Sequence, residues 1–143
     1  LVVLMQTLLW LIFTDDFPAI LFRDTRLTAA LVLGSSVLSP SATFVPSIML
    51  TATLIHFAIS IVYTAFVAAL TARLDATRAL LAGLGFGIVL YLLNLYGFTA
   101  IFPWFVQARG WITLITHGLF GVTAVLVCRW LYISNVRSGP DGH

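Results

Sequence analysis

Ser47–Leu70 reads SIMLTATLIHFAISIVYTAFVAAL and contains no Asp, Glu, Lys or Arg. About 20 mostly apolar residues in a helix cross the roughly 30 Å hydrocarbon core of a bilayer, where the backbone must satisfy its own hydrogen bonds. Pro46, a residue suited to the first turn of a helix, precedes this stretch. We therefore predict a transmembrane helix over 47–70.

Three further apolar stretches extend the pattern. Residues 79–102 and 111–133 have the length of a span, and Asp75 is a plausible N-cap for the first of them. Residues 1–13 are apolar but cover only about 20 Å at about 1.5 Å per residue, so they cross a bilayer only if more chain precedes them. We predict that they belong to the first of four spanning helices.

A shorter apolar segment follows the first helix. Leu27–Leu38 contains Gly34 and is closed by Pro40, and it is too short to span. It is more typical of an interfacial or re-entrant helix. The expected fold class is all-α: one transmembrane domain over 1–143, a bundle of four spanning helices with this short helix after the first.

Composition narrows the class of protein. Hydrophobic residues make up 61% of the chain, charged residues only 8%, and the mean hydropathy is +1.09. The charged residues are seven Arg and five Asp, and the arginines are scattered, so nucleic-acid binding, which needs clustered cations, is not expected. Cys128 is the only cysteine, which excludes an internal disulfide and a CxxC redox pair.

The arginines predict an orientation in the membrane. Cytoplasmic loops carry an excess of Lys and Arg. Four arginines fall on one predicted side, Arg73, Arg78, Arg129 and Arg137, and three on the other, Arg23, Arg26 and Arg109. Both chain ends are therefore expected in the cytoplasm, with the turn over 102–111, rich in aromatic residues, at the outer headgroup level.

Three polar residues lie in the middle of predicted spans, where polar side chains are costly and usually face the bundle interior. At about 1.5 Å per residue, His56 lies about 15 Å below Pro46, Asn94 about 12 Å below Phe102 and His117 about 9 Å below Trp111. Each belongs to a stripe of small or polar residues at helical spacing: Thr53, His56, Ser60 and Tyr63; Gly83, Gly87 and Asn94; Thr113, His117, Gly121 and Ala124. These stripes are expected to meet.

Several readings of this polar layer stay open. The simplest is that His56, Asn94 and His117 hydrogen-bond to one another, to backbone carbonyls or to water, and so fix helix register. Alternatively, His56 and His117 are the axial ligands of a b-type haem, with room for the ring at Gly118 and Gly121 and with Arg109 near a propionate. A quinone contact or a proton relay is a further alternative, because histidine changes charge near physiological pH.

Catalysis by the chain itself is not expected. The predicted spans contain no Asp or Glu, and no Ser-His-Asp set, HExxH motif, phosphate loop or EF-hand loop is present. Gly83 and Gly87 form a small-xxx-small pattern that serves helix packing, either within the chain or against a neighbour. We predict no metal site and no catalytic residue.

Three stretches carry a resemblance to a known group: HFAISIVY (His56–Tyr63); LNLYGFT (Leu93–Thr99) with the nearby FPWF (Phe102–Phe105), Arg109 and Trp111; and HGLFG (His117–Gly121). With these motifs, the last two thirds of the chain resemble small four-helix bacterial inner-membrane proteins. The resemblance implies a multi-pass protein of the cytoplasmic membrane and no activity.

The function expected from these observations is that of a non-catalytic accessory or scaffold subunit of a larger inner-membrane complex, such as a respiratory or photosynthetic one. Its partners would be the lipid bilayer and other membrane subunits. The alternatives are a haem b-binding or quinone-linked electron-transfer protein that uses His56 and His117, and a small transporter or channel subunit whose pathway is lined by His56, Asn94 and His117.

Overall fold

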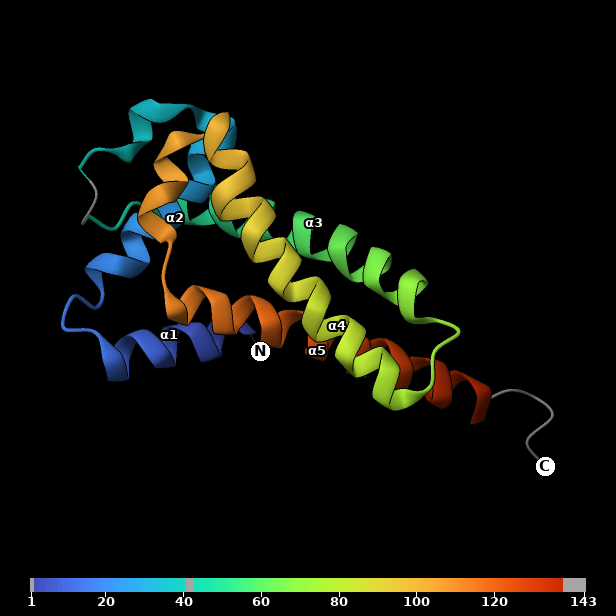
Figure 1. Cartoon of the computed structure of the whole chain (residues 1–143). Helices are drawn as coiled ribbons and strands as arrows, with labels where there is room; N and C mark the ends of the chain where they lie inside the picture. Colours follow the sequence, from blue (N-terminus) through green and yellow to red (C-terminus); the bar gives the residue numbers. More distant parts are fainter. Residues whose placement is uncertain (1, 41–42, 138–143) are drawn as a thin grey trace.

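The computed structural model describes residues 2–40 and 43–137, and every regular element in these ranges is helical. In chain order the elements are α1 (Val2–Phe13), α2 (Ala19–Leu33), η1 (Ser35–Leu38), α3 (Pro46–Thr71), α4 (Ala76–Leu92), η2 (Leu93–Gly97), η3 (Phe98–Ala100), η4 (Pro103–Ala108) and α5 (Trp111–Arg137). Figure 1 shows that α3, α4 and α5 run between two ends of the molecule. The end of the molecule formed by α2 and η1–η4 is called the broad end, and the end formed by residues 71–76 is called the turn end.

Three helical stretches are long and apolar enough to cross a membrane: Pro46–Thr71, Ala76–Ala100 and Trp111–Ser134, of 26, 25 and 24 residues. The first helix, α1, has 12 residues and lies along the first part of α5 (Figure 1). A crossing requires about 20 residues. The all-helical class is therefore confirmed with three helices able to span a membrane, whereas a fourth span, and with it the four-helix bundle, is not shown.

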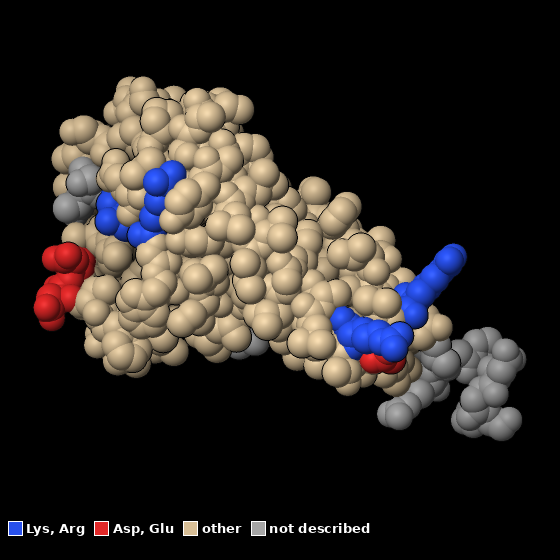
Figure 2. All heavy atoms as spheres, in the orientation of Figure 1, with Lys and Arg blue, Asp and Glu red and all other residues tan. Residues whose placement is uncertain are grey.

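In the described part of the chain, the charged side chains of one face lie at its two ends. In the face drawn in Figure 2, the acidic and basic side chains gather at the broad end and at the turn end, and the band between them carries none. The sequence of α3 agrees, since Pro46–Thr71 contains no charged residue. Because a charge in hydrocarbon is costly, this distribution is the one expected for helices surrounded by lipid.

Glycines bring α4 and α5 into backbone contact. A Cβ atom added at Gly83 would lie 2.7 Å from the carbonyl oxygen of Gly121, and one added at Gly87 would overlap the carbonyl of His117. The buried cluster beside this contact consists of Val67, Ala79, Ala124 and Val125. Of the two uses expected for the small-xxx-small pattern, packing within the chain is therefore the one observed.

The turn end is held by three polar contacts. The Asp75 side chain caps α4 by accepting a hydrogen bond of 3.0 Å from the Arg78 backbone N–H, which confirms the predicted N-cap. The same carboxylate pairs with the Arg78 guanidinium at 3.2 Å. From α5, Arg129 donates to the Leu74 carbonyl oxygen at 3.0 Å and so closes the turn between α3 and α4.

The segment after α1 differs from the prediction. A helix was expected over 27–38, but α2 spans Ala19–Leu33, ends at Gly34 with φ +81°, and is followed by the separate η1. The helix accommodates Arg26, which is almost fully buried at 3% exposure, because its guanidinium has hydrogen-bond acceptors. It donates to the Val37 carbonyl at 2.7 Å and to Thr43 at 2.8 and 3.1 Å. These bonds fold the connection to α3 back onto α2.

Candidate functional site

His117 is held in one orientation by its own helix. Its Nδ1 lies 2.8 Å from the Thr113 carbonyl oxygen, one turn earlier in α5. Since a carbonyl only accepts, Nδ1 carries the proton and Nε2 is left as the acceptor. The imidazole meets the Tyr91 ring of α4 edge to face, with 5.8 Å between centroids.

His56, on α3, is more open than His117. It shares a face of α3 with Tyr63 and the buried Val67. Its side chain is nevertheless exposed, and within the described ranges it makes no hydrogen bond. In the part of the chain that the structure describes, the two histidines make no hydrogen bond to each other.

Asn94 joins α3 to the end of α4. Its Oδ1 accepts a hydrogen bond of 3.2 Å from the Tyr63 hydroxyl. Asn94 belongs to η2, a π-helical turn that interrupts the helix predicted to run straight from 79 to 102. The predicted layer therefore forms in part: Asn94 pairs with Tyr63 and His117 with Thr113, rather than with each other.

Arg109 holds the π-helical turn from the outside. Its Nε donates to the Leu95 carbonyl oxygen at 2.8 Å, its Nη2 donates to the Thr99 hydroxyl at 3.2 Å, and its guanidinium lies 4.1 Å from the centre of the Tyr96 ring. Wide helical turns leave carbonyls without a regular partner, so these contacts stabilise η2. Tyr96 in turn meets the ring of Tyr91 at 5.9 Å.

Three aromatic rings in contact, followed by a guanidinium group, therefore connect α5 to the broad end. This line runs from His117 through Tyr91 and Tyr96 to Arg109. Two of the four residues predicted for the site, Arg109 and His117, are the ends of this line, whereas Asn94 is bonded to Tyr63 of α3. Tyr91 and Tyr96 were not singled out from the sequence, where tyrosines near a span end are typical of the aromatic belt.

The space expected for a flat ring is filled by protein. Gly121 faces the backbone of Gly83, with the oxygen of Gly83 where a Cβ would stand. A Cβ at Gly118 would lie 3.1 Å from the Leu84 side chain. The α4 backbone therefore occupies the space beside Gly121, and the Leu84 side chain lies beside Gly118. The haem alternative stays a prediction.

A small cavity at the broad end contains charged residues that the sequence analysis did not assign to any site. It has a volume of about 160 Å³ and lies among α1, α2 and the start of α5. Its lining includes Trp10, Thr14, Arg23, Asp24, Arg109, Gly110, Trp111 and Thr113. The signal that could have found Asp24 is its spacing of three residues from the buried Leu27, which places both on one face of α2.

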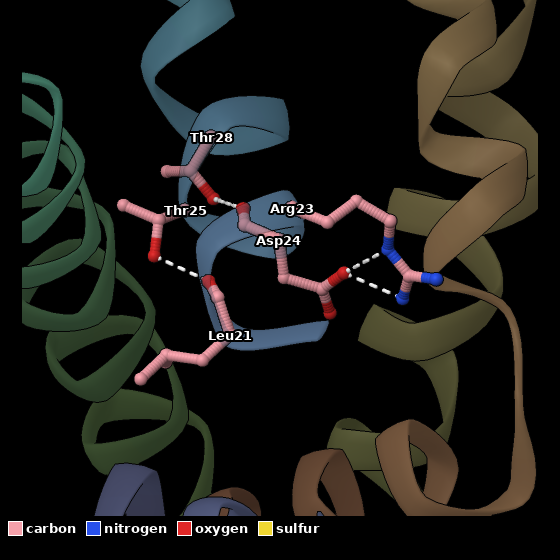
Figure 3. A network of polar contacts seen from close by, with 5 residues as sticks. All are labelled: Leu21, Arg23, Asp24, Thr25 and Thr28. Carbon is pink, nitrogen blue, oxygen red and sulfur yellow. Dashed lines mark hydrogen bonds and ion pairs between the residues drawn. The ribbon is translucent and has the colours of Figure 1, made fainter. Parts of the chain in front are cut away.

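Asp24 is a partly buried carboxylate next to a cation. Figure 3 shows its pairing with Arg23, whose Nε and Nη2 donate at 2.8 and 2.7 Å. The Asp24 side chain is 16% exposed. Burial raises the pKa of the Asp24 carboxyl above its ordinary value, and the neighbouring Arg23 guanidinium opposes that rise without cancelling it.

Comparisons with protein-family models, with curated proteins and with solved structures found no match to this chain.

Proposed function

We propose that this chain is a non-catalytic subunit of a larger membrane assembly, and that α3 is the helix it presents to a neighbouring subunit. The observation that carries the proposal is the exposure of α3. Along its 26 residues only Ala52, Val67 and Thr71 are buried. Of the three helices able to span a membrane, α3 has the smallest buried share.

The chemistry of the exposed face supports a protein neighbour rather than lipid alone. His56 is exposed on α3, and an imidazole facing hydrocarbon lacks a hydrogen-bond partner. A shallow hollow on the same helix is lined by Phe57, Ser60, Ile61, Thr64 and Ala65. Small and hydroxyl-bearing residues of this kind let a second helix approach closely and exchange hydrogen bonds.

The polar contacts between parts of the chain support a scaffold rather than a catalyst. Asn94, Arg109 and His117 each bond to a neighbouring turn or helix, so their contacts already have a structural role. We place the protein in the bacterial inner membrane with the turn end in the cytoplasm. Arg73, Arg78 and Arg129 support that orientation, while at the broad end Arg23 is neutralised by Asp24.

Site-specific photo-crosslinking in native membranes tests the proposal. A benzophenone side chain at Ile61 in the hollow is compared with one at Leu81 on α4, because the two residues are 67% and 64% exposed. We expect Ile61 to form adducts with a different membrane protein and Leu81 to form adducts with lipid. We also expect the gently solubilised protein to migrate with a large complex.

Two outcomes would overturn the proposal. Adducts with lipid alone at both positions would mean that α3 faces the bilayer. Adducts only with a second copy of the chain would mean that α3 mediates self-assembly and that the chain is not an accessory subunit of another protein.

A further inference from the structure

The cavity at the broad end combines both signs of charge in a small volume. Arg23, Asp24 and Arg109 all line it, and its volume of about 160 Å³ is below the roughly 300–1,000 Å³ of pockets for drug-sized ligands. A ligand of this size would have few heavy atoms. It would have to satisfy two guanidinium groups and one carboxylate.

The carboxylate keeps one oxygen available. Both hydrogen bonds from Arg23 end on Oδ1 of Asp24, and Figure 3 shows the second carboxylate oxygen outside the dashed contacts. Within the described ranges, Oδ2 has no hydrogen-bond partner. It can therefore accept a hydrogen bond from a ligand cation.

The guanidinium groups keep donors available as well. Arg109 uses Nε and Nη2 on Leu95 and Thr99, and Arg23 uses Nε and Nη2 on Asp24. Each arginine therefore retains its Nη1 donors within the described part of the chain. The first turn of α5 lines the same cavity, and the N–H groups of a first helical turn lack partners within their helix and favour an anion.

We propose that this cavity binds a zwitterionic phosphoethanolamine group, with its phosphate toward Arg23 and Arg109 and its ammonium on the free oxygen of Asp24. The ammonium donates and the carboxylate accepts, while the phosphate oxygens accept from the guanidinium donors. A purely anionic ligand would leave the free Asp24 oxygen without a hydrogen-bond donor, and its negative charge would be repelled by the Asp24 carboxylate.

The surroundings of the cavity favour a membrane lipid as the source of this group. Trp10 and Trp111 line the cavity, and Phe13 meets Trp111 edge to face at 5.3 Å. Aromatic side chains of this kind settle at the headgroup level of a bilayer. Phosphatidylethanolamine carries the required headgroup, and its acyl chains could extend along the apolar surface of α1.

The proposal is tested by measuring lipid preference on the full chain in mixed micelles by native mass spectrometry. Phosphatidylethanolamine is compared with phosphatidylglycerol, which keeps the phosphate and lacks the ammonium. We expect wild-type protein to retain phosphatidylethanolamine about tenfold more strongly, the factor that a charge-assisted hydrogen bond of about 1.4 kcal/mol supplies. Free phosphoethanolamine is added as a competitor, and its effective competition at equal concentration would identify a soluble ligand of the same chemistry.

Two variants separate the ammonium from the phosphate contacts. Asp24→Asn should bring the ratio of the two lipids to about one while phosphatidylglycerol is still retained, since a neutral amide attracts an ammonium much less. Arg109→Gln should weaken both lipids together. The controls are Asp15→Asn and Arg78→Gln, which change exposed charges outside the cavity.

For Asp24→Asn a ratio of lipids is used, because a misfolded variant would lose both lipids and leave no ratio to measure. For Arg109→Gln, whose side chain also stabilises η2, the thermal unfolding curve in the same micelles is recorded beside that of wild type to separate a lost contact from misfolding. The proposal fails if wild-type protein does not prefer phosphatidylethanolamine. It also fails if Asp24→Asn keeps the wild-type preference, or if Arg78→Gln weakens binding as much as Arg109→Gln.

Discussion

Arginines in this chain have different roles that depend on what surrounds each guanidinium. Arg78 is exposed and pairs with Asp75, an arrangement worth little in water. Arg26 is buried without a carboxylate, and its Nε has no partner in the described ranges, while its terminal nitrogens bind Val37 and Thr43. Removing the Arg26 guanidinium would leave the Val37 carbonyl oxygen and the Thr43 carbonyl and hydroxyl oxygens without this donor.

Asp24 makes folding depend on pH. Since burial raises the pKa of its carboxyl, the folded chain binds this proton more tightly than the unfolded chain does. The group therefore favours folding below its unfolded pKa, and this contribution is lost as the pH rises through the folded pKa. We expect the Tm of the purified protein to fall across this window, and to fall less steeply in Asp24→Asn.

The control for this measurement is Asp15→Asn, because Asp15 is exposed at the same end of the molecule. It should keep the wild-type dependence of Tm on pH. Equal slopes for Asp24→Asn and wild type would contradict the link between Asp24 burial and stability.

At the scale of the elements, α4 and α5 come into backbone contact at the glycines of α4 that face α5. The glycines of α4 are not equivalent: Gly83 and Gly87 face the α5 backbone, whereas a Cβ at Gly85 would meet nothing within 4 Å. Helix periodicity explains this difference, because positions four apart share a face and the position between them points away.

Alanine substitutions at these glycines should therefore have opposite effects on stability. We expect Gly83→Ala and Gly87→Ala to lower the free energy of unfolding by about 1–3 kcal/mol, the usual result of overpacking. Gly85→Ala should leave it unchanged or raise it by up to about 1 kcal/mol through helix propensity. Unfolding of the three variants in mixed micelles with increasing denaturing detergent measures these differences, and equal losses at all three positions would contradict the packing.

The end of α4 shows where helical periodicity alone does not predict local structure. The apolar pattern over 79–102 predicts one straight helix, yet the chain changes to a π-helical turn at Leu93. The contacts of Arg109 with Leu95 and Thr99 stabilise that turn from a segment fourteen and ten residues away. The sequence places Arg109 near the outer headgroup level, but it does not predict the partners of Arg109, because these depend on how the chain folds back after η3.

At the scale of the whole molecule, the face drawn in Figure 2 has an uncharged band between two charged ends. If the turn end is cytoplasmic, as we propose, single cysteines should report it in a Cys128→Ser background. We expect Gln107→Cys to react with an impermeant maleimide in intact cells, and Asp75→Cys to react only after permeabilisation. Both wild-type side chains are exposed, so accessibility does not favour either position. The reverse labelling pattern would contradict the orientation.

The sequence by itself determined that the chain is helical and that three long stretches suit a bilayer. This follows because hydrocarbon offers no hydrogen-bond partner to the backbone, so an apolar stretch of this length has almost no alternative to a helix. The same reasoning indicated that His56, Asn94 and His117 face inward, and two of them do make contacts inside the chain. It did not establish a fourth span, since α1 has only 12 residues.

Only the tertiary structure decided which polar groups meet. Tyr63 and Asn94 are 31 residues apart, and Trp104 donates to the Leu27 carbonyl across 77 residues. Such pairs depend on the rotation and relative height of whole helices, which apolar periodicity leaves undetermined because lipid is as apolar as the side chains it surrounds. For the same reason, the cavity of Arg23, Asp24 and Arg109 emerges only when α1, α2 and α5 come together.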